Sequence, residues 1–250
     1  MQLSKPSIAK KLIPIAILTT LLGAIGWGTG FYFGLIRIQE PDRQQYPIRG
    51  IDISAFQKQI DWSNLDRREV DFIFMKATEG GDFKDPSFPD NWRNAGQSKL
   101  NRGAYHFFTF CKPGKTQAQN FISTVPVENN TLPPIIDLEF IGNCKVRPSV
   151  ATLKKELQDY ITEVQKTYQQ TPILYTTQEF YDAYLQNAFI ANPIWISNFY
   201  SQPRLADGRQ WTFWQYTERG RVTGVPTLVD RNVFNGSKEK FQQLLSRSLR

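Results

Sequence analysis

The segment PPIIDLEF, residues 133–140, contains two carboxylates in an otherwise apolar run. A buried strand is normally almost free of charge, because an unpaired buried carboxylate costs several kcal/mol. Side chains two positions apart in a strand point to the same face, which places Asp137 and Glu139 about 7 Å apart along the chain. Two carboxyl groups on one face can supply a proton and stabilise a developing positive charge, which is the chemistry that cleaves glycosidic bonds.

A D-x-E pair by itself does not establish a site, because either carboxylate could form a structural ion pair with Lys76 or Arg102. The wider pattern favours a site, since polar side chains also stand late in other apolar runs. These further candidates are Asp52, Lys76, Glu79, His106, Tyr175, Trp195, Ser197, Gln215 and Asp230. If Asp52, Asp137, Glu139 and Asp230 are gathered together, each raises the pKa of the others, and at least one stays protonated near neutral pH.

The elements that must position these residues follow from the hydrophobic pattern. Short apolar segments alternate with amphipathic ones from residue 48 onward, which predicts an α/β fold with a parallel sheet. Eight strand candidates indicate a modified TIM-like barrel, whose active site would lie at the C-terminal ends of the strands. The candidates are 48–54, 71–77, 102–108, 133–139, 171–176, 192–198, 211–217 and 228–234. Helices are expected at 149–169, with Ser149 as the N-cap, and at 177–188.

Aromatic residues near the strand ends favour a sugar ligand. Tyr175, Trp195, Trp214 and Tyr216 could stack flat faces on pyranose rings. For each residue taken alone, packing in the core is the simpler explanation. As a group, they indicate that at least one lines a groove.

A series of short motifs runs through residues 50–235 in a fixed order. They are GIDIS at 50–54, FIFMKATEG at 72–80, RGAYHFF at 102–108, PPIIDLE at 133–139, PILYTT at 172–177, PIWISNF at 193–199, FWQYT at 213–217 and VDRNVFNG at 229–236. In this order and spacing they resemble glycoside hydrolase family 25, the lysozymes that act as N-acetylmuramidases. The resemblance implies a barrel of eight strands and about five helices. It also implies hydrolysis of the β-1,4 bond between N-acetylmuramic acid and N-acetylglucosamine in peptidoglycan.

Carried over position by position, the resemblance makes Glu139 the general acid and Asp137 its partner, which steers the acetamido group of the substrate or stabilises charge. Asp52 and Asp230 complete the carboxylates of the site. The implied substrate contacts are Tyr175, Trp195 and Gln215, with Lys76, Glu79 and His106 in supporting positions. An enzyme carboxylate, a water molecule and the acetamido group all remain open as the nucleophile.

The N-terminal part predicts a membrane anchor. Residues 12–36 contain no charged side chain, and Arg37 follows them. As a helix this run would span about 37 Å, enough to cross a bilayer. A cleaved signal peptide, the alternative, has a shorter apolar core and a small-residue cleavage site. Lys10 and Lys11 before the run place the N-terminus in the cytoplasm and the body in the periplasm or outside the cell.

This interpretation divides the chain into a cytoplasmic stub (1–11), a single-pass anchor (12–36), a linker (37–47) and a glycoside hydrolase barrel domain (48–250). The lipid bilayer would then be a partner of the anchor. Gly26, Gly30 and Gly34 recur every four residues, a spacing that can bring two membrane helices together.

The remaining composition excludes several classes of function. The formal net charge is +7, but no run of Lys and Arg is interleaved with aromatics, so a nucleic-acid surface is not expected. With His106 as the only histidine and no CxxC motif, neither a metal site nor a cofactor is expected. Cys111 and Cys144 follow the third and fourth strands, and we expect a disulfide that braces the rim of the site.

Two functions other than catalysis remain compatible with the sequence. The first is a non-catalytic barrel that binds peptidoglycan, and its signature would be loss of one of the carboxylates. The second is a membrane-anchored platform for partner proteins, which would bind no saccharide.

Overall fold

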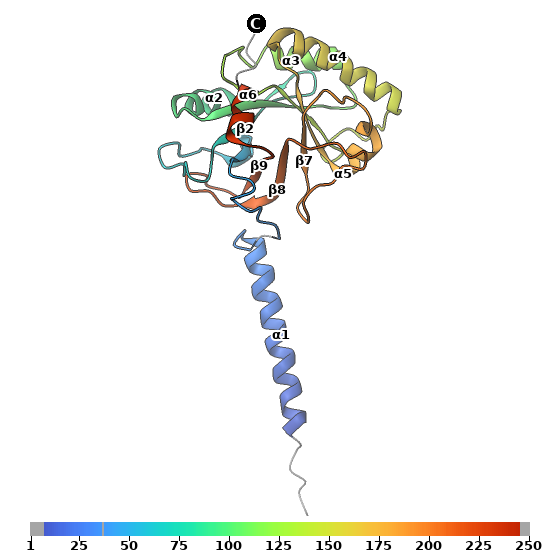
Figure 1. The fold of residues 1–250 in the computed structure, drawn as a ribbon. Helices are drawn as coiled ribbons and strands as arrows, with labels where there is room; N and C mark the ends of the chain where they lie inside the picture. The colour runs from blue at the N-terminus through green and yellow to red at the C-terminus, as the bar shows by residue number, and fades with distance from the viewer. Residues whose placement is uncertain (1–7, 37, 246–250) are drawn as a thin grey trace, which may run out of the picture.

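The computed structural model describes residues 8–36 and 38–245, and within them eight strands close into a barrel (Figure 1). Seven residues of the expected cytoplasmic stub, 1–7, lie outside the described part. The order around the barrel is β1, β2, β4, β5, β6, β7, β8, β9 and back to β1. The strands are β1 (Arg49–Ile53), β2 (Phe72–Glu79), β4 (Asn101–Phe107), β5 (Ile135–Leu138), β6 (Ile173–Thr177), β7 (Ile194–Ser197), β8 (Phe213–Gly220) and β9 (Val229–Phe234). A ninth, β3 (Phe83–Lys84), only extends β2.

Helices surround the barrel. They are α2 (Phe88–Gln97), α3 (Gly114–Ile122), α4 (Val150–Tyr168), α5 (Gln178–Phe180), which continues as one π turn (Tyr181–Leu185), and α6 (Lys238–Leu245). The helix expected at 149–169 is confirmed, and Ser149 caps it by accepting a hydrogen bond from the backbone N–H of Thr152. The helix expected at 177–188 is shorter than predicted and ends in the π turn.

The direction of β9 corrects the expectation of an all-parallel sheet. β9 runs antiparallel to both of its neighbours, β1 and β8. A parallel crossover needs about a dozen residues or more, and the connection from 221 to 228 is too short to provide one. Because β9 is reversed, Asp230 at its beginning reaches the same end of the barrel as Asp52, and the two are directly paired across the strands.

Alternation along the strands separates two apolar layers. One fills the barrel interior, where Phe72, Phe74, Trp195 and Phe213 pack with ring centroids 4.6–5.2 Å apart. The other lies between the strands and the surrounding helices and includes Ile51, Ile73, Leu153 and Leu157. Since the barrel is filled in this way, polar chemistry is confined to the mouth.

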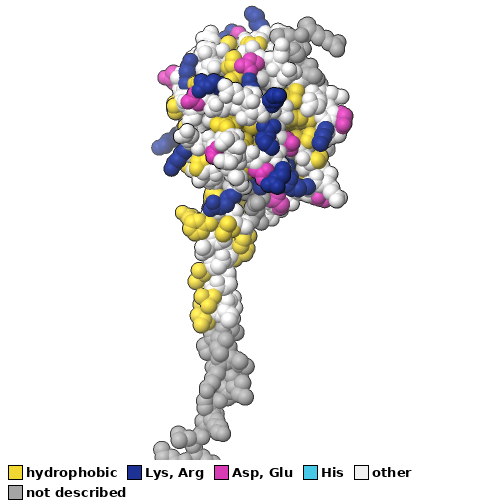
Figure 2. All heavy atoms as spheres, turned by 90° about the vertical axis from the view of Figure 1, so that its left-hand side faces the viewer, with side chains coloured by type: hydrophobic (Ala, Val, Ile, Leu, Met, Phe, Trp, Pro, Cys, Tyr) yellow, Lys and Arg dark blue, Asp and Glu magenta, His cyan; other side chains and the backbone are white. Residues whose placement is uncertain are grey.

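The helix α1 (Ile8–Tyr32) projects from the body as a stalk (Figure 1). Apolar side chains lie exposed along it, whereas charges of both signs are dispersed over the face of the body seen in Figure 2. The guanidinium of Arg219 donates to the carbonyl oxygen of Phe31 at 3.0 Å, and that of Arg221 donates to Phe33 at 2.7 Å. These bonds join the end of the stalk to β8 and the turn that follows it.

The expected anchor at 12–36 is not confirmed. In the described part of the chain, none of the helices combines the length and hydropathy that a membrane crossing needs. The three-glycine stripe is also interrupted, because α1 ends at Tyr32 and Gly34 lies beyond it with φ +68°, packed against the backbone of Arg219. Gly30 is covered by the side chain of Ile36, so helix pairing through this stripe has no support.

Candidate active site

The mouth of the barrel holds a cavity of about 340 Å³. The structure brings to it most of the residues that the sequence analysis singled out for chemistry: Asp52, Asp137, Glu139, Tyr175, Trp195, Ser197, Gln215 and Asp230. The rest of its lining is Tyr105, Ile141, Thr177, Phe199 and Glu218. These side chains come from β1, β4, β5, β6, β7, β8, β9 and the loops that follow them, so the site depends on the whole closed barrel.

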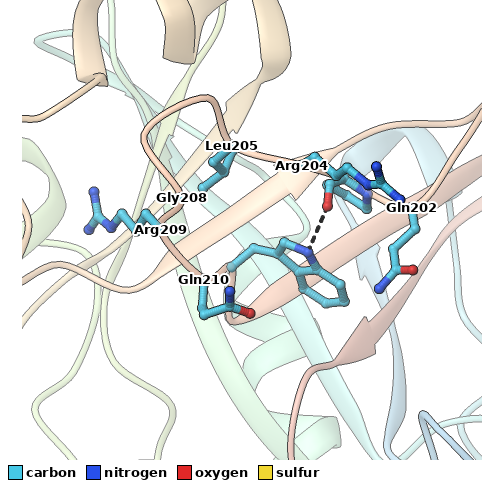
Figure 3. Close-up of a pocket in the computed structure, with 8 residues that line it drawn as sticks. Gln202, Arg204, Leu205, Gly208, Arg209 and Gln210 are labelled. Atoms are coloured by element: carbon cyan, nitrogen blue, oxygen red, sulfur yellow. Dashed lines mark hydrogen bonds between the residues drawn. The ribbon is translucent and has the colours of Figure 1, made fainter.

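A second cavity, of about 370 Å³, lies in the segment that joins β7 to β8 (Figure 3). There Trp211 Nε1 donates to the carbonyl oxygen of Pro203 at 3.1 Å. The charged residues of its lining are Arg204 and Arg209, and Arg209 already donates to carbonyl oxygens at 188, 189 and 192. Among the described residues, this lining carries no carboxylate, so it offers no acid for such chemistry.

Asp52 is a buried carboxyl group surrounded by donors. Asn232 Nδ2 donates to its Oδ2 at 2.7 Å, and Gln215 Nε2 lies 3.1 Å and 3.3 Å from its two oxygens. Asp230 shares a hydrogen bond with Asp52 across the β1–β9 pair. Burial raises the pKa of Asp52, and the hydrogen bonds from Asn232 and Gln215 offset part of that rise.

Asp137 and Glu139 stand at the end of β5, Asp137 within the strand and Glu139 one residue beyond it. Burial, followed by the charge of Glu139, raises the pKa of Asp137 well above its ordinary value. Burial, followed by the charge of Asp52, raises the pKa of Glu139 to about 7. Among the described residues, Oδ1 of Asp137 has no hydrogen-bond partner. The site therefore pairs an acid that is protonated up to neutral pH with a buried acceptor ready for a donor from a ligand.

Lys76 and Glu79 lie beside the cavity but do not line it. Lys76 Nζ forms an ion pair with Glu79 at 2.7 Å and stands 5.1 Å from the ring centroid of Phe107. The charge of Lys76 lowers the pKa of both Asp137 and Glu139, against the larger effect of burial. Lys76 thus acts on the two carboxyl groups through the electrostatic effect of its charge.

His106 points away from the cavity, which does not fit the expected substrate contact. It is fully buried between the strands and the helices, with Nδ1 2.7 Å from Thr78 Oγ1 and Nε2 3.1 Å from Gln117 Oε1. Burial lowers the pKa of His106 to about 3, so the ring is neutral. The prediction missed the parity of the strand: Tyr105, one residue earlier, is the side chain that lines the cavity.

Other lining residues also escaped the sequence analysis. Ile141 and Glu218 come from a loop and a strand end without a motif that marks them, and Phe199 is the last residue of the motif PIWISNF. For Asn232 a signal was present, because it is a polar residue two positions after Asp230 and thus shares its face of β9. Asn232 is fully buried and touches Asp52, so it belongs to the site.

Cys111 and Cys144 form a disulfide, as expected, and it joins the loops that follow β4 and β5. Beside it, Asn143 Nδ2 donates to the carbonyl oxygens of Phe108 at 2.8 Å and Glu139 at 3.0 Å. Asn143 Oδ1 accepts from the backbone N–H of Phe110 at 3.0 Å. The two loops are therefore held together where the backbone of Glu139 leaves its strand.

A closed barrel with protonatable carboxylates gathered at its mouth defines a glycoside hydrolase. Comparison with known proteins gives the family. The sequence profile of the glycosyl hydrolases family 25 matches residues 51–225. The chain belongs to this family.

Individual relatives agree with the profile. The protein YegX of Escherichia coli (strain K12) is 36% identical over 202 residues, which covers 79% of this chain and 73% of YegX. Lysozyme M1 of Streptomyces globisporus is 34% identical over 208 residues, with 79% and 71% covered. The solved structure of a family 25 glycosyl hydrolase from Bacillus anthracis superposes with a TM-score of 0.77 at 43% identity, covering 82% of this chain and 95% of that one.

Proposed function

We propose that this chain is a peptidoglycan muramidase that cleaves the β-1,4 bond between N-acetylmuramic acid and N-acetylglucosamine, with Glu139 as its general acid. Family membership and the lysozymes among its relatives support the activity. The observation that carries the role of Glu139 is its position at the mouth of the barrel with a pKa of about 7. At that pKa the group holds a proton at mildly acidic and neutral pH, and can give it to the leaving glycosidic oxygen.

The other carboxylates have complementary tasks. Asp137 is buried beside Glu139, and its Oδ1, which has no partner in the described part of the chain, can accept a hydrogen bond from the acetamido N–H of the sugar. Asp52 supplies negative charge to the positive charge that develops on the sugar ring in the transition state. Tyr175 and Trp195 also line this cavity, but both are buried, so they form its floor beneath the glycan.

The test incubates purified peptidoglycan with a protein of residues 43–250, once with the wild-type sequence and once with the substitution Glu139→Gln. We expect fragments that end in reducing N-acetylmuramic acid, identified by mass spectrometry and reducing-end analysis. Glu139→Gln should lose activity by about 10²- to 10⁴-fold, the usual contribution of a general acid. Wild-type activity should also fall as the pH rises above about 7, when Glu139 loses its proton. Binding to intact sacculi without cleavage, by a folded protein, would instead indicate a wall-binding barrel.

We also propose that the N-terminal region anchors the barrel to a membrane, with its N-terminus cytoplasmic and the barrel periplasmic or extracellular. The support is the uncharged run at 12–36 and the exposed apolar side chains of α1, such as Leu18, Leu22 and Ile25. Retention of the full chain, but not of residues 43–250, in membranes washed with alkaline carbonate tests this placement. Release of the full chain by the same wash would contradict it.

A further inference from the structure

The hydrogen bonds around Asp52 have a polarity that the chain itself fixes. An indole N–H can only donate, and Trp195 Nε1 lies 2.8 Å from Asn232. The oxygen of the Asn232 amide must therefore face Trp195. Its NH₂ group is then left to face Asp52, 2.7 Å away.

A second chain of bonds has the same polarity. The hydroxyl of Tyr175 donates to Gln215 Oε1 at 2.9 Å, which turns the NH₂ of Gln215 toward Asp52. Tyr175 keeps its proton, because burial and then the charge of Glu139 raise its pKa well above the ordinary value. Asn232, Gln215, Tyr175 and Trp195 are all buried. Asn232 cannot turn over without leaving two buried donors facing each other, because an indole cannot accept. Gln215 keeps its orientation while the Tyr175 hydroxyl donates to it, since a hydroxyl can also accept.

Asp52 therefore meets two N–H donors, both nearest to its Oδ2, and this oxygen is required to accept. Among the described residues, Asp230, its cross-strand partner, meets no such pair of amides, and it shares a hydrogen bond with Asp52. Two carboxyl groups in hydrogen-bond contact hold a proton between them at neutral pH. The donors decide which member of the pair carries it.

We infer that Asn232 and Gln215, oriented by Trp195 and Tyr175, keep Asp52 ionised and place the shared proton on Asp230. Asn232 is then a positioning residue for the reaction, since it acts through Asp52. Asp52 becomes the single fixed negative charge of the pair, and Asp230 serves as a neutral donor to it. The inference deepens the proposed muramidase function and rests on it for its kinetic test.

Other titratable groups also face Asp52, and they set the conditions of the test. They are Tyr105 from β4, Asp137 from β5, Glu139 after β5, Tyr175 from β6 and Asp230 from β9. Glu139 sets the alkaline limb of the activity profile. At the acid side of the same profile, activity falls as Asp52 gains a proton. The pH of this acid limb therefore reports the effect of Asn232 on Asp52.

The first experiment compares Asp52→Asn with Asp230→Asn in the hydrolysis of purified peptidoglycan. A neutral amide can replace a protonated carboxyl group as a donor but cannot replace a carboxylate. We expect both variants to lose activity, Asp52→Asn by at least about 100-fold and by at least about tenfold more than Asp230→Asn. Equal losses in both variants, or a larger loss in Asp230→Asn, would overturn the assignment.

The second experiment measures the pH profile of kcat/KM for Asn232→Leu. Loss of the donor should move the acid limb upward by about one pH unit or more. The matched control is Asn235→Leu, because Asn235 also bonds to a tryptophan residue, the carbonyl oxygen of Trp211 at 3.0 Å, but does not touch the site. In the control, the acid limb of kcat/KM should lie at the same pH as in the wild type, even if the substitution lowers stability. An unshifted limb in a folded Asn232→Leu protein contradicts the positioning role.

A third measurement does not depend on activity. In protein with ¹³C-labelled aspartate carboxyl groups, the resonance of Asp52 should titrate at lower pH than that of Asp230, with the two Asn variants giving the assignments. The reverse order would refute the inference even if the enzyme cleaves peptidoglycan. If the order holds and no cleavage occurs, the muramidase proposal fails on its own.

Discussion

Two buried polar clusters lie on opposite faces of the barrel strands, and they differ in how fully their groups are paired. In the His106 cluster (Thr78, His106 and Gln117), each ring nitrogen has a partner and the ring is neutral. In the carboxylate cluster (Asp52, Asp137, Glu139 and Asp230), acids crowd together and Asp137 Oδ1 has no partner among the described residues.

The difference shows what each cluster contributes. Complete pairing makes a buried polar group compatible with the core and leaves it no reactivity, so the His106 cluster serves stability. Incomplete pairing keeps carboxyl groups protonated against their ordinary tendency, and that is the property a general acid needs. The carboxylate cluster should therefore be costly for folding and necessary for activity. Four changes test this contrast.

The largest effect is expected for Asp137→Asn, which should lower activity by about 10²- to 10³-fold, because an amide cannot ionise and accept a charge-assisted hydrogen bond from the acetamido N–H of the substrate. The free energy of unfolding should stay equal or rise, since a neutral amide costs less to bury than an ionisable carboxyl group. Reducing-end release and urea unfolding measure the two quantities. A loss of both activity and stability would show that Asp137 stabilises the fold, as the His106 cluster does.

The next effect concerns stability as a function of pH. The pKa of Glu139 is about 7 in the folded state, above its ordinary value of 4.5. As the pH rises from 4.5 to 7, the unfolded chain loses this proton before the folded chain does, and stability therefore falls. Glu139→Gln should remove that decline, gaining on the order of 3 kcal/mol relative to wild type by pH 7. A constant difference between pH 4 and 8 would show that the folded state does not raise this pKa.

Thr78→Val should have the opposite signature. It keeps the shape of the side chain but leaves Nδ1 of His106 buried without a donor, which costs about 1–3 kcal/mol. Activity of the folded protein should remain within about twofold of wild type, because neither residue lines the cavity. Urea midpoints and kcat/KM at pH 6 give both values. A large fall in kcat/KM would mean that the two clusters are coupled.

The smallest effect is expected for Lys76→Gln. Its charge lowers the pKa of Glu139, so its removal should move the alkaline limb of activity to higher pH by less than about one unit. Lys84→Gln, at an exposed lysine on β3, is the control and should leave the limb in place. A shift toward lower pH would show that Lys76 does not act on Glu139 through its charge.

The sequence predicted the strands well because each is a compact apolar run, and it predicted the carboxylates because charge inside such a run is conspicuous. The role of His106 could not be predicted in the same way, since a shift of one residue moves a side chain from the cavity to the opposite face. The role of Asn232 rests on its hydrogen bonds with Trp195 and Asp52, and only the closed barrel brings these three residues together. The reversed β9 was predictable in principle, from the length of the preceding connection.

The pairing of β1 with β9 also has a consequence for the order of events during folding. Asp52 and Asn232 are 180 positions apart, and they meet only where the first strand of the barrel joins the last. A chain made from its N-terminus exposes β1 long before β9 exists, so this contact must form late. The nascent enzyme is therefore inert until its barrel is complete, and a molecule stalled or cut before residue 229 has no site with which to damage a wall.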